Sequence, residues 1–302
     1  MGWLIFGEGV EIKTPFFAKR KREIMEVDLH IHTIASDGTF TPEEVVLEAK
    51  NRGLKAIAIT DHDTVDGLIE AKNKAKDIGI EFIQGIEISC NTNEYEVHIL
   101  GYFLNLEDKK FMSELDELKK ARDIRNFKIV EKLKNCGIEA NLEEIADMAP
   151  GKIISRLHFA NYLVKKGVTI SKEEAFDKYL GKRGKAYVPK ENFPPERAVK
   201  ILNDNGAFVS LAHPKLVVNN DGIIENMISN LVKFGLNGIE AQYGTFSPSD
   251  IKKYKKMAKR HSLLVTGGSD FHGANREGVN IGDTGLTYSQ FRLIKERNAG
   301  GK

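Results

Sequence analysis

Short apolar segments alternate with longer amphipathic ones through the first hundred residues, and this alternation constrains the fold more than any other feature. Residues 41–53 begin with threonine and proline and end with glycine, which is typical of an α-helix, and 65–79 have a similar amphipathic pattern. The apolar segments have the length of buried strands, so the pattern predicts a parallel sheet or an α/β barrel. The predicted strands are residues 26–31, 55–60, 80–90 and 96–104.

The alternation stops near residue 106 and resumes near residue 186. Residues 106–185 have the pattern of helices and no convincing strand, with 108–137 forming one long helix or two. We therefore predict an inserted helical subdomain over 106–185 within a barrel formed by 26–105 and 186–298, a size that suits a single α/β barrel. The other predicted helices are 142–149, 155–167, 171–181, 195–206 and 249–261, and the other strands are 207–213, 237–243 and 262–270.

The charge balance argues against one class of partner. The chain has 45 basic and 43 acidic residues among 302, a net charge of +2, so charge alone does not favour wrapping a nucleic-acid backbone. A local basic pocket for one phosphate stays compatible with this balance. No apolar segment has the roughly 18–20 residues of a membrane helix.

The N-terminal residues and the cysteines indicate a cytoplasmic protein. Residues 1–25 lack the features of a signal peptide, and Cys90 and Cys136 form no CxxC pair or disulfide framework, which suits a reducing compartment. We expect residues 1–25, which carry a basic run at 19–22, to be an appendage to the barrel. It is either a short ordered arm or a segment that precedes a natural start at Met25.

Polar side chains gather where the predicted strands end. Because the carboxyl ends of parallel strands meet at one face of a barrel, we expect these side chains to lie close together. Six of the eight histidines lie at or near such ends, whereas His261 follows a helix at the opposite face and is expected to be structural. The polar residues at strand ends are His30, His32, Asp37, Asp61, His62, Asp63, Glu87, His98, His213, Asp270 and His272.

A single histidine beside an apolar strand is more often a hydrogen-bonded core residue than a ligand. The repetition at five or more strand ends favours metal, because so many buried polar groups without ligands would cost about 1–3 kcal/mol each. In a strand, the His-x-His spacing of His30 and His32 places both rings on one face. Mixed imidazole and carboxylate donors suit zinc, manganese or iron.

These residues, in this order, resemble the PHP (polymerase and histidinol phosphatase) superfamily. The similar stretches are "DLHIHTIASDGTFTPEE", "AITDHDTVDG", "GIEIS", "EVHILGY", "LAHP" and "GSDFHG", which span residues 27–275. The resemblance implies a distorted (β/α)7 TIM-like barrel with a trinuclear metal centre. It implies His30, His32, Glu87 and Asp270 around the first metal, Asp37, His62 and His272 around the second, and His98 and His213 around the third, with Glu87 as a bridge.

The predicted insertion indicates a particular subfamily of this superfamily. "ISRLHFANYLV" and "YLGKRGKAYVP" resemble the subfamily of 3',5'-nucleoside bisphosphate phosphatases and 5'-to-3' exoribonucleases, in which the helical insert covers the active site. An Arg-x-His pair there reaches the substrate, which implies substrate-binding roles for Arg156 and His158. This chain has Leu157 between them, where the subfamily has proline. A solvated helix face for Arg156 and a core position for His158 are the alternatives.

The expected activity is that of a phosphoric monoester hydrolase. Two or three divalent metal ions, manganese first and zinc or iron otherwise, would activate water against nucleoside 3',5'-bisphosphates or AMP-like nucleotides. Asp63 is a candidate for orienting the metal ligands. Lys215 either contacts a phosphate or is simply exposed. The general acid is His98, His213 or a metal-bound water, and the sequence does not distinguish among them. The alternatives are a 5'-to-3' exonuclease on short RNA, a histidinol-phosphate phosphatase and a non-catalytic metal-binding module. No membrane and no obligate protein partner is expected.

Overall fold

The computed structural model describes residues 25–149, 151, 153–189 and 193–300. All but one residue of the predicted N-terminal appendage therefore lies outside the described residues. Seven strands form a single sheet in the order β1-β2-β3-β4-β5-β6-β7, and contacts between β1 and β7 bring the two edges of the sheet together. The predicted α/β class with a TIM-like barrel is confirmed. The strands are β1 (Val27–Asp28), β2 (Ala56–Ile59), β3 (Glu81–Asn91), β4 (Glu96–Tyr102), β5 (Phe208–Leu211), β6 (Gly238–Tyr243) and β7 (Leu264–Gly268).

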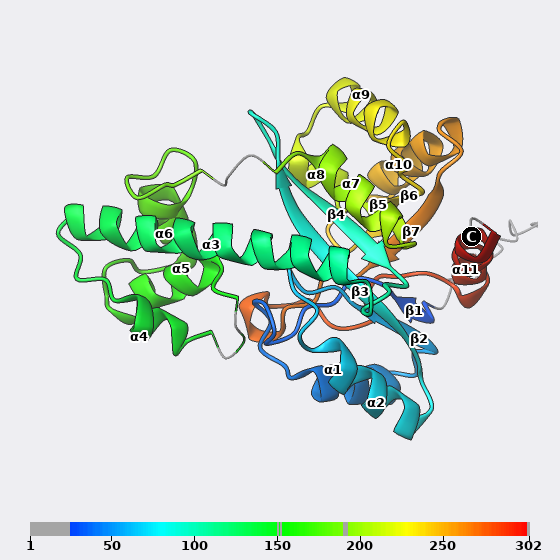
Figure 1. Cartoon of the computed structure of the whole chain (residues 1–302), viewed down its shortest axis with the longest axis horizontal. Helices are drawn as coiled ribbons and strands as arrows, with labels where there is room; N and C mark the ends of the chain where they lie inside the picture. The colour runs from blue at the N-terminus through cyan, green and yellow to red at the C-terminus, as the bar shows by residue number, and fades with distance from the viewer. Residues whose placement is uncertain (1–24, 150, 152, 190–192, 301–302) are drawn as a thin grey trace, which may run out of the picture.

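The helices lie outside the sheet and in a separate group at one end of the molecule (Figure 1). Helix α1 begins with a full capping box, in which Thr41 and Glu44 satisfy each other's backbone N–H groups. The helices are α1 (Pro42–Asn51), α2 (Leu68–Ile78), α3 (Lys109–Asn135), α4 (Leu142–Ala146), α5 (Arg156–Lys165), α6 (Lys172–Ala175), η1 (Phe176–Leu180), α7 (Pro195–Asp204), α8 (Pro214–Val217), α9 (Asp221–Val232), α10 (Pro248–Arg260), η2 (Gly273–Asn275) and α11 (Tyr288–Gly300). None of the helices in the described residues has the length and apolar character needed to cross a bilayer.

The sheet is parallel except at β4, which pairs antiparallel with both β3 and β5. The alternation of strands and helices predicted a parallel arrangement, and β4 departs from it because a tight turn joins it to β3. In that turn the Thr92 N–H donates to the Tyr95 carbonyl at 2.8 Å. A short connection of this kind permits only antiparallel pairing, whereas parallel neighbours need a crossover.

The first strand is shorter than predicted. Residues 26–31 were expected to be extended, but the ladder covers only Val27–Asp28. The Asp28 carboxylate accepts the His30 N–H at 3.2 Å, and the Leu29 N–H donates to the Gly267 carbonyl in β7. Because a side chain takes the His30 amide, the ladder with β2 ends there, and the chain that carries His30 turns across the barrel end.

Helix α3 connects two apolar cores. Phe111 and Leu115 in its first half pack in the barrel core, whereas Ile129 and Leu133 in its second half pack with α4, α5 and η1. The segment 108–137 is one helix, Lys109–Asn135. The helical group formed by α4, α5, α6 and η1 lies beside the C-terminal half of this helix (Figure 1). A separate core of this kind is compatible with the predicted helical insertion over 106–185.

Candidate metal centre

The carboxylate of Glu87 lies at the centre of the polar cluster at the strand ends. Its Oε2 atom lies 3.3 Å from His30 Nε2, 3.2 Å from His32 Nε2 and 3.1 Å from His62 Nδ1. Its Oε1 atom lies 3.0 Å from both His98 Nδ1 and His213 Nε2. Glu87 belongs to β3, is 1% exposed, and therefore places one acidic group within contact distance of five imidazoles.

Asp270 closes the cluster from the end of β7. Its Oδ1 atom lies 3.2 Å from His30 Nε2 and 3.1 Å from His32 Nε2. The two ring nitrogens are themselves 3.2 Å apart. Four donor atoms, from His30, His32, Glu87 and Asp270, thus surround one point, and all four residues are buried.

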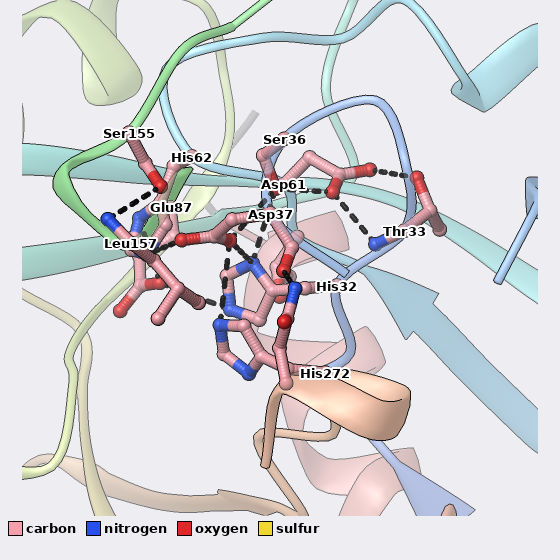
Figure 2. A network of polar contacts seen from close by, with 12 residues as sticks. His32, Thr33, Ser36, Asp37, Asp61, His62, Glu87, Ser155, Leu157 and His272 are labelled. Atoms are coloured by element: carbon pink, nitrogen blue, oxygen red, sulfur yellow. Dashed lines mark hydrogen bonds and ion pairs between the residues drawn. The ribbon is translucent and has the colours of Figure 1, made fainter. Parts of the chain in front are cut away.

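A second group of donors lies beside the first. Asp37 follows β1, and its Oδ1 atom lies 3.4 Å from His272 Nε2 and 3.8 Å from His32 Nδ1. His62 also faces this carboxylate, with Nε2 4.0 Å from Asp37 Oδ2. Figure 2 shows these side chains converging from three loops. A third group joins His62, Glu87 and His98, so all nine sequence-predicted ligand residues lie in one contiguous cluster.

Burial and charge act against each other in this cluster. Burial opposes ionisation of Glu87, but the imidazoles of His62, His30 and His98 outweigh it and hold the Glu87 pKa well below its ordinary value. Burial also opposes protonation of His32, yet its hydrogen bonds with Asp270 and Glu87 raise the His32 pKa to about 10. The carboxylates of the cluster therefore favour positive charge between the donor atoms, and a divalent metal ion would supply that charge in place of the ring protons.

The backbone is strained at two of the candidate ligands. His213 has φ 23° and Asp270 has φ 56°, values in the left-handed region that residues with a Cβ seldom adopt. Such strain tends to occur at functional sites, where the surrounding structure holds the residue in place. At β7, Gly268 permits close approach of the strand to His30, because a Cβ there would lie 2.4 Å from the His30 backbone nitrogen.

Glu240 is a functional candidate that the sequence analysis missed. It lies within β6 and is fully buried, and its Oε1 atom lies 3.0 Å from His30 Nδ1. Its Oε2 atom accepts the His213 backbone N–H at 2.8 Å. An acidic residue in the middle of the apolar segment "NGIEAQY" was the available signal, since such a residue is costly unless it has a buried partner.

Three further residues support the ligands. The Asp61 carboxylate accepts from the Thr33 N–H at 2.8 Å and from the Ser36 hydroxyl at 2.6 Å, which fixes the loop that leads to Asp37 (Figure 2). The Tyr243 hydroxyl donates to Asp270 at 2.7 Å, and Arg276 pairs with the same carboxylate. None of these supporting roles was predicted from the sequence.

Asp63, the sequence-predicted orienting residue, lies between β3 and α3. Its carboxylate accepts the Ser89 backbone N–H at 2.7 Å and forms an ion pair with Arg122. The Ser89 hydroxyl lies 3.4 Å from His62 Nδ1. Through Ser89, Asp63 therefore connects α3 of the helical group to the neighbourhood of a candidate ligand.

The sequence-predicted substrate residues occupy different environments. Arg156 lines the cavities next to the cluster, and it forms an ion pair with Glu96 at 2.6 Å. His158 is buried, and its Nδ1 atom accepts the Ser155 N–H at 3.0 Å as part of the capping box of α5. This bond gives His158 a structural role. Leu157, between them, lines the same cavity as Asp37 (Figure 2).

Two other basic residues have partners away from the cluster. The Lys215 ammonium donates to Asp250 at 2.7 Å. His261, expected to be structural, lies 2.6 Å from Glu225 in α9.

Comparisons with known proteins agree with this geometry. The sequence profile of the PHP domain matches residues 28–187. The chain belongs to the PHP family. It is similar to the 3',5'-nucleoside bisphosphate phosphatase of Chromobacterium violaceum, with 32% identity over 85% of this chain and 91% of that protein. It is also similar to the 5'-3' exoribonuclease of Haemophilus influenzae, with 32% identity over 81% of this chain and 89% of that protein.

A solved structure supports the fold over nearly the whole chain. It is an amidohydrolase from Chromobacterium violaceum with bound sulfate and no metal. It has a TM-score of 0.81 and 31% identity, and the match covers 90% of this chain and 96% of that one. The PHP family membership and the buried cluster of imidazoles and carboxylates together identify the protein as a phosphoesterase of the hydrolase class.

Proposed function

We propose that this PHP protein removes a phosphate from nucleoside 3',5'-bisphosphates or AMP-like nucleotides by hydrolysis with two or three divalent metal ions, manganese first among them. The observation that carries the proposal is the contact of Glu87 with five imidazoles at the strand ends. The similarity to the Chromobacterium bisphosphate phosphatase supports the substrate class.

The donor set fits such ions. The ring nitrogens of His30 and His32 face each other at 3.2 Å, beside the oxygens of Glu87 and Asp270. Imidazole and carboxylate donors in one buried group suit manganese, zinc or iron. In the proposed assignment, three ions would be held by separate donor groups: the first by His30, His32, Glu87 and Asp270, the second by Asp37, His62 and His272, and the third by His98 and His213 together with Glu87.

The bound ions would supply Lewis acidity and a water of lowered pKa near neutral pH. The chain's own residues bind the substrate and orient the metal ligands. Glu240 holds the His30 ring, and Tyr243 and Arg276 hold the Asp270 carboxylate, so the donors keep their directions as the substrate arrives. Arg156, at the wall of the cavity, presents a planar guanidinium that can bind phosphate oxygens in pairs.

A 5'-to-3' exonuclease on short RNA is the second candidate. The similarity to the Haemophilus exoribonuclease favours it, and the chemistry at the cluster would be the same. The length of the substrate distinguishes the two activities. The near-neutral charge of the chain favours small substrates over long nucleic acids.

The test is phosphate release by the purified, manganese-loaded protein from adenosine 3',5'-bisphosphate, a 5'-phosphorylated RNA oligomer and histidinol phosphate. Rapid release from the bisphosphate alone supports the phosphatase. Stepwise appearance of mononucleotides from the oligomer supports the exonuclease. Phosphate release from histidinol phosphate alone supports a histidinol-phosphate phosphatase. Absence of turnover on all three, with metal confirmed bound, would reject the substrate class.

A further inference from the structure

Arg125 is a buried cation to which the described residues supply no ion pair. It lies on α3 and is 6% exposed, and its Nε atom has no hydrogen-bond partner. Within the part of the chain that the structure describes, no ion pair reaches its guanidinium. Leaving a charge buried and unpaired is costly, so such a residue needs a reason for its position.

The neighbouring arginines are compensated, and Arg125 is not. Arg122 pairs with Asp63, and Arg156 pairs with Glu96. Burial, followed by repulsion from Arg122 and Arg156, lowers the Arg125 pKa to about 9 against the attraction of Glu96 and Asp63, so its side chain is still charged at neutral pH. The excess positive charge of this group therefore lies at Arg125.

Arg125 is a lining residue of two cavities. One has a volume of about 140 Å³ and is also lined by Asp37, His62 and His98 of the cluster. The other has a volume of about 580 Å³, and its lining includes Tyr95 and Tyr187. Arg125 lines both cavities, so it lies between the cluster and a larger space that could accept the rest of a substrate.

We propose that Arg125 binds a second, non-reacting phosphate group of the substrate while the reacting phosphate lies at the cluster. The proposal rests on the proposed function and makes Arg125 a residue that determines specificity. A phosphate group would satisfy the buried guanidinium with paired, charge-assisted hydrogen bonds. The group is either the second terminal phosphate of a nucleoside bisphosphate or the 5'-terminal phosphate of a short oligonucleotide whose diester is hydrolysed.

The test compares substrates with one and with two phosphate groups. The kcat/KM of the manganese-loaded full chain is measured on adenosine 3'-monophosphate, adenosine 5'-monophosphate, adenosine 3',5'-bisphosphate and the 5'-phosphorylated dinucleotide pApA. The variants are Arg125→Met, Arg125→Lys and the control Lys128→Met, which removes an exposed charge one turn further along α3. Arg125→Met should lower the ratio of kcat/KM for a two-phosphate substrate over a monophosphate by about 10- to 150-fold, the value of one hydrogen bond to a charged group.

The pattern across substrates decides the source of the second phosphate. A fall in the ratio for the bisphosphate, with inorganic phosphate as the product, identifies the second phosphate of a nucleoside bisphosphate. A fall for pApA, with a mononucleotide as the product, identifies the 5'-terminal phosphate of an oligonucleotide. Arg125→Lys should lie between wild type and Arg125→Met, and Lys128→Met should match wild type. An equal loss on monophosphates and two-phosphate substrates, or a wild type without any preference for the second phosphate, would overturn the proposal.

Failure of the proposed function gives a different result. If the wild-type protein hydrolyses none of these nucleotides, their binding to the same metal-loaded protein is measured directly by calorimetry. Tighter binding of adenosine 3',5'-bisphosphate to wild type than to Arg125→Met by the same factor would then support the second phosphate site. Equal affinity of the two proteins would reject it.

Discussion

The Nδ1 atom of His30 lies 3.0 Å from the Oε1 atom of Glu240, and both side chains are fully buried. The other Glu240 oxygen accepts the His213 backbone N–H. One carboxylate in β6 thus fixes two candidate ligands that follow different strands, β1 and β5. As an acceptor, Glu240 favours the His30 tautomer that carries its proton on Nδ1, which leaves Nε2 free to face Glu87, Asp270 and a metal ion.

Glu240→Gln should therefore weaken metal binding. A glutamine offers one oxygen to the two donors, His30 Nδ1–H and the His213 N–H, and its amide group faces one of them as a second donor. Loss of such a supporting contact lowers metal affinity or activity by about 10- to 100-fold. Metal titration of the apoprotein measures the change. The control is Glu225→Gln, which alters a glutamate beside His261 outside the cluster and should leave affinity unchanged; equal affinities of both variants would contradict the role.

Asp61→Ala should loosen the loop between His32 and Asp37. The carboxylate accepts hydrogen bonds from Thr33 and Ser36, and its loss leaves the buried Thr33 donors without this acceptor, at about 1–3 kcal/mol. We expect a lower free energy of unfolding and fewer metal ions bound per chain. Urea unfolding and metal analysis test both. Asp77→Ala, at an exposed position in α2, is the control, and an Asp61 variant that behaves like it would refute the assignment.

The burial of His158 predicts that the free energy of unfolding depends on pH. Burial lowers its pKa below the ordinary 6.5, and Arg122 adds to this effect, although Asp37 opposes it. Below pH 6.5 the unfolded chain binds a proton that the folded state excludes, so stability falls as the pH decreases, by at most about 1.4 kcal/mol per pH unit. Above pH 6.5 the contribution is constant.

The variant His158→Gln removes this titration and keeps a side chain that suits the third position of a capping box. The difference in unfolding free energy between wild type and His158→Gln should therefore decrease from pH 7.5 to pH 5. Denaturant unfolding at several pH values measures it. A difference that stays constant with pH would show that His158 titrates normally in the folded state.

Arg125→Met should stabilise the ligand-free protein. The change replaces an unpaired buried cation by an apolar side chain of similar length, and removal of such a charge is expected to raise the free energy of unfolding by about 1 kcal/mol or more. Thermal unfolding of wild type, Arg125→Met and Lys128→Met measures the effect. A lower melting temperature for Arg125→Met than for the control would mean that the guanidinium has a stabilising partner.

The sequence predicted the features that depend on local pattern. The helix 41–53 was predicted from its cap and its glycine, and the structure places α1 at Pro42–Asn51. The polar residues at strand ends were expected to converge because parallel strands bring their carboxyl ends to one face, and Glu87 contacts five of the six histidines concerned.

Features that depend on contacts distant in the sequence could not be predicted. Glu240 lies 210 residues from His30, so nothing in either segment indicates their pairing. The shortened β1 depends on Asp28 and on Gly267 at the far end of the chain. Arg125 has the sequence environment of a solvated helix face, and only the packing of the helical group buries it.

The central claim, that this cluster binds the metal ions that drive hydrolysis, is tested most directly by one paired measurement. Bound manganese and phosphate release from adenosine 3',5'-bisphosphate are measured on wild type and on Asp270→Ala, with circular dichroism to verify the fold. We predict two or three ions per wild-type chain with turnover, and fewer ions with turnover lost in a folded Asp270→Ala. Wild-type metal content and turnover in the variant would contradict the account.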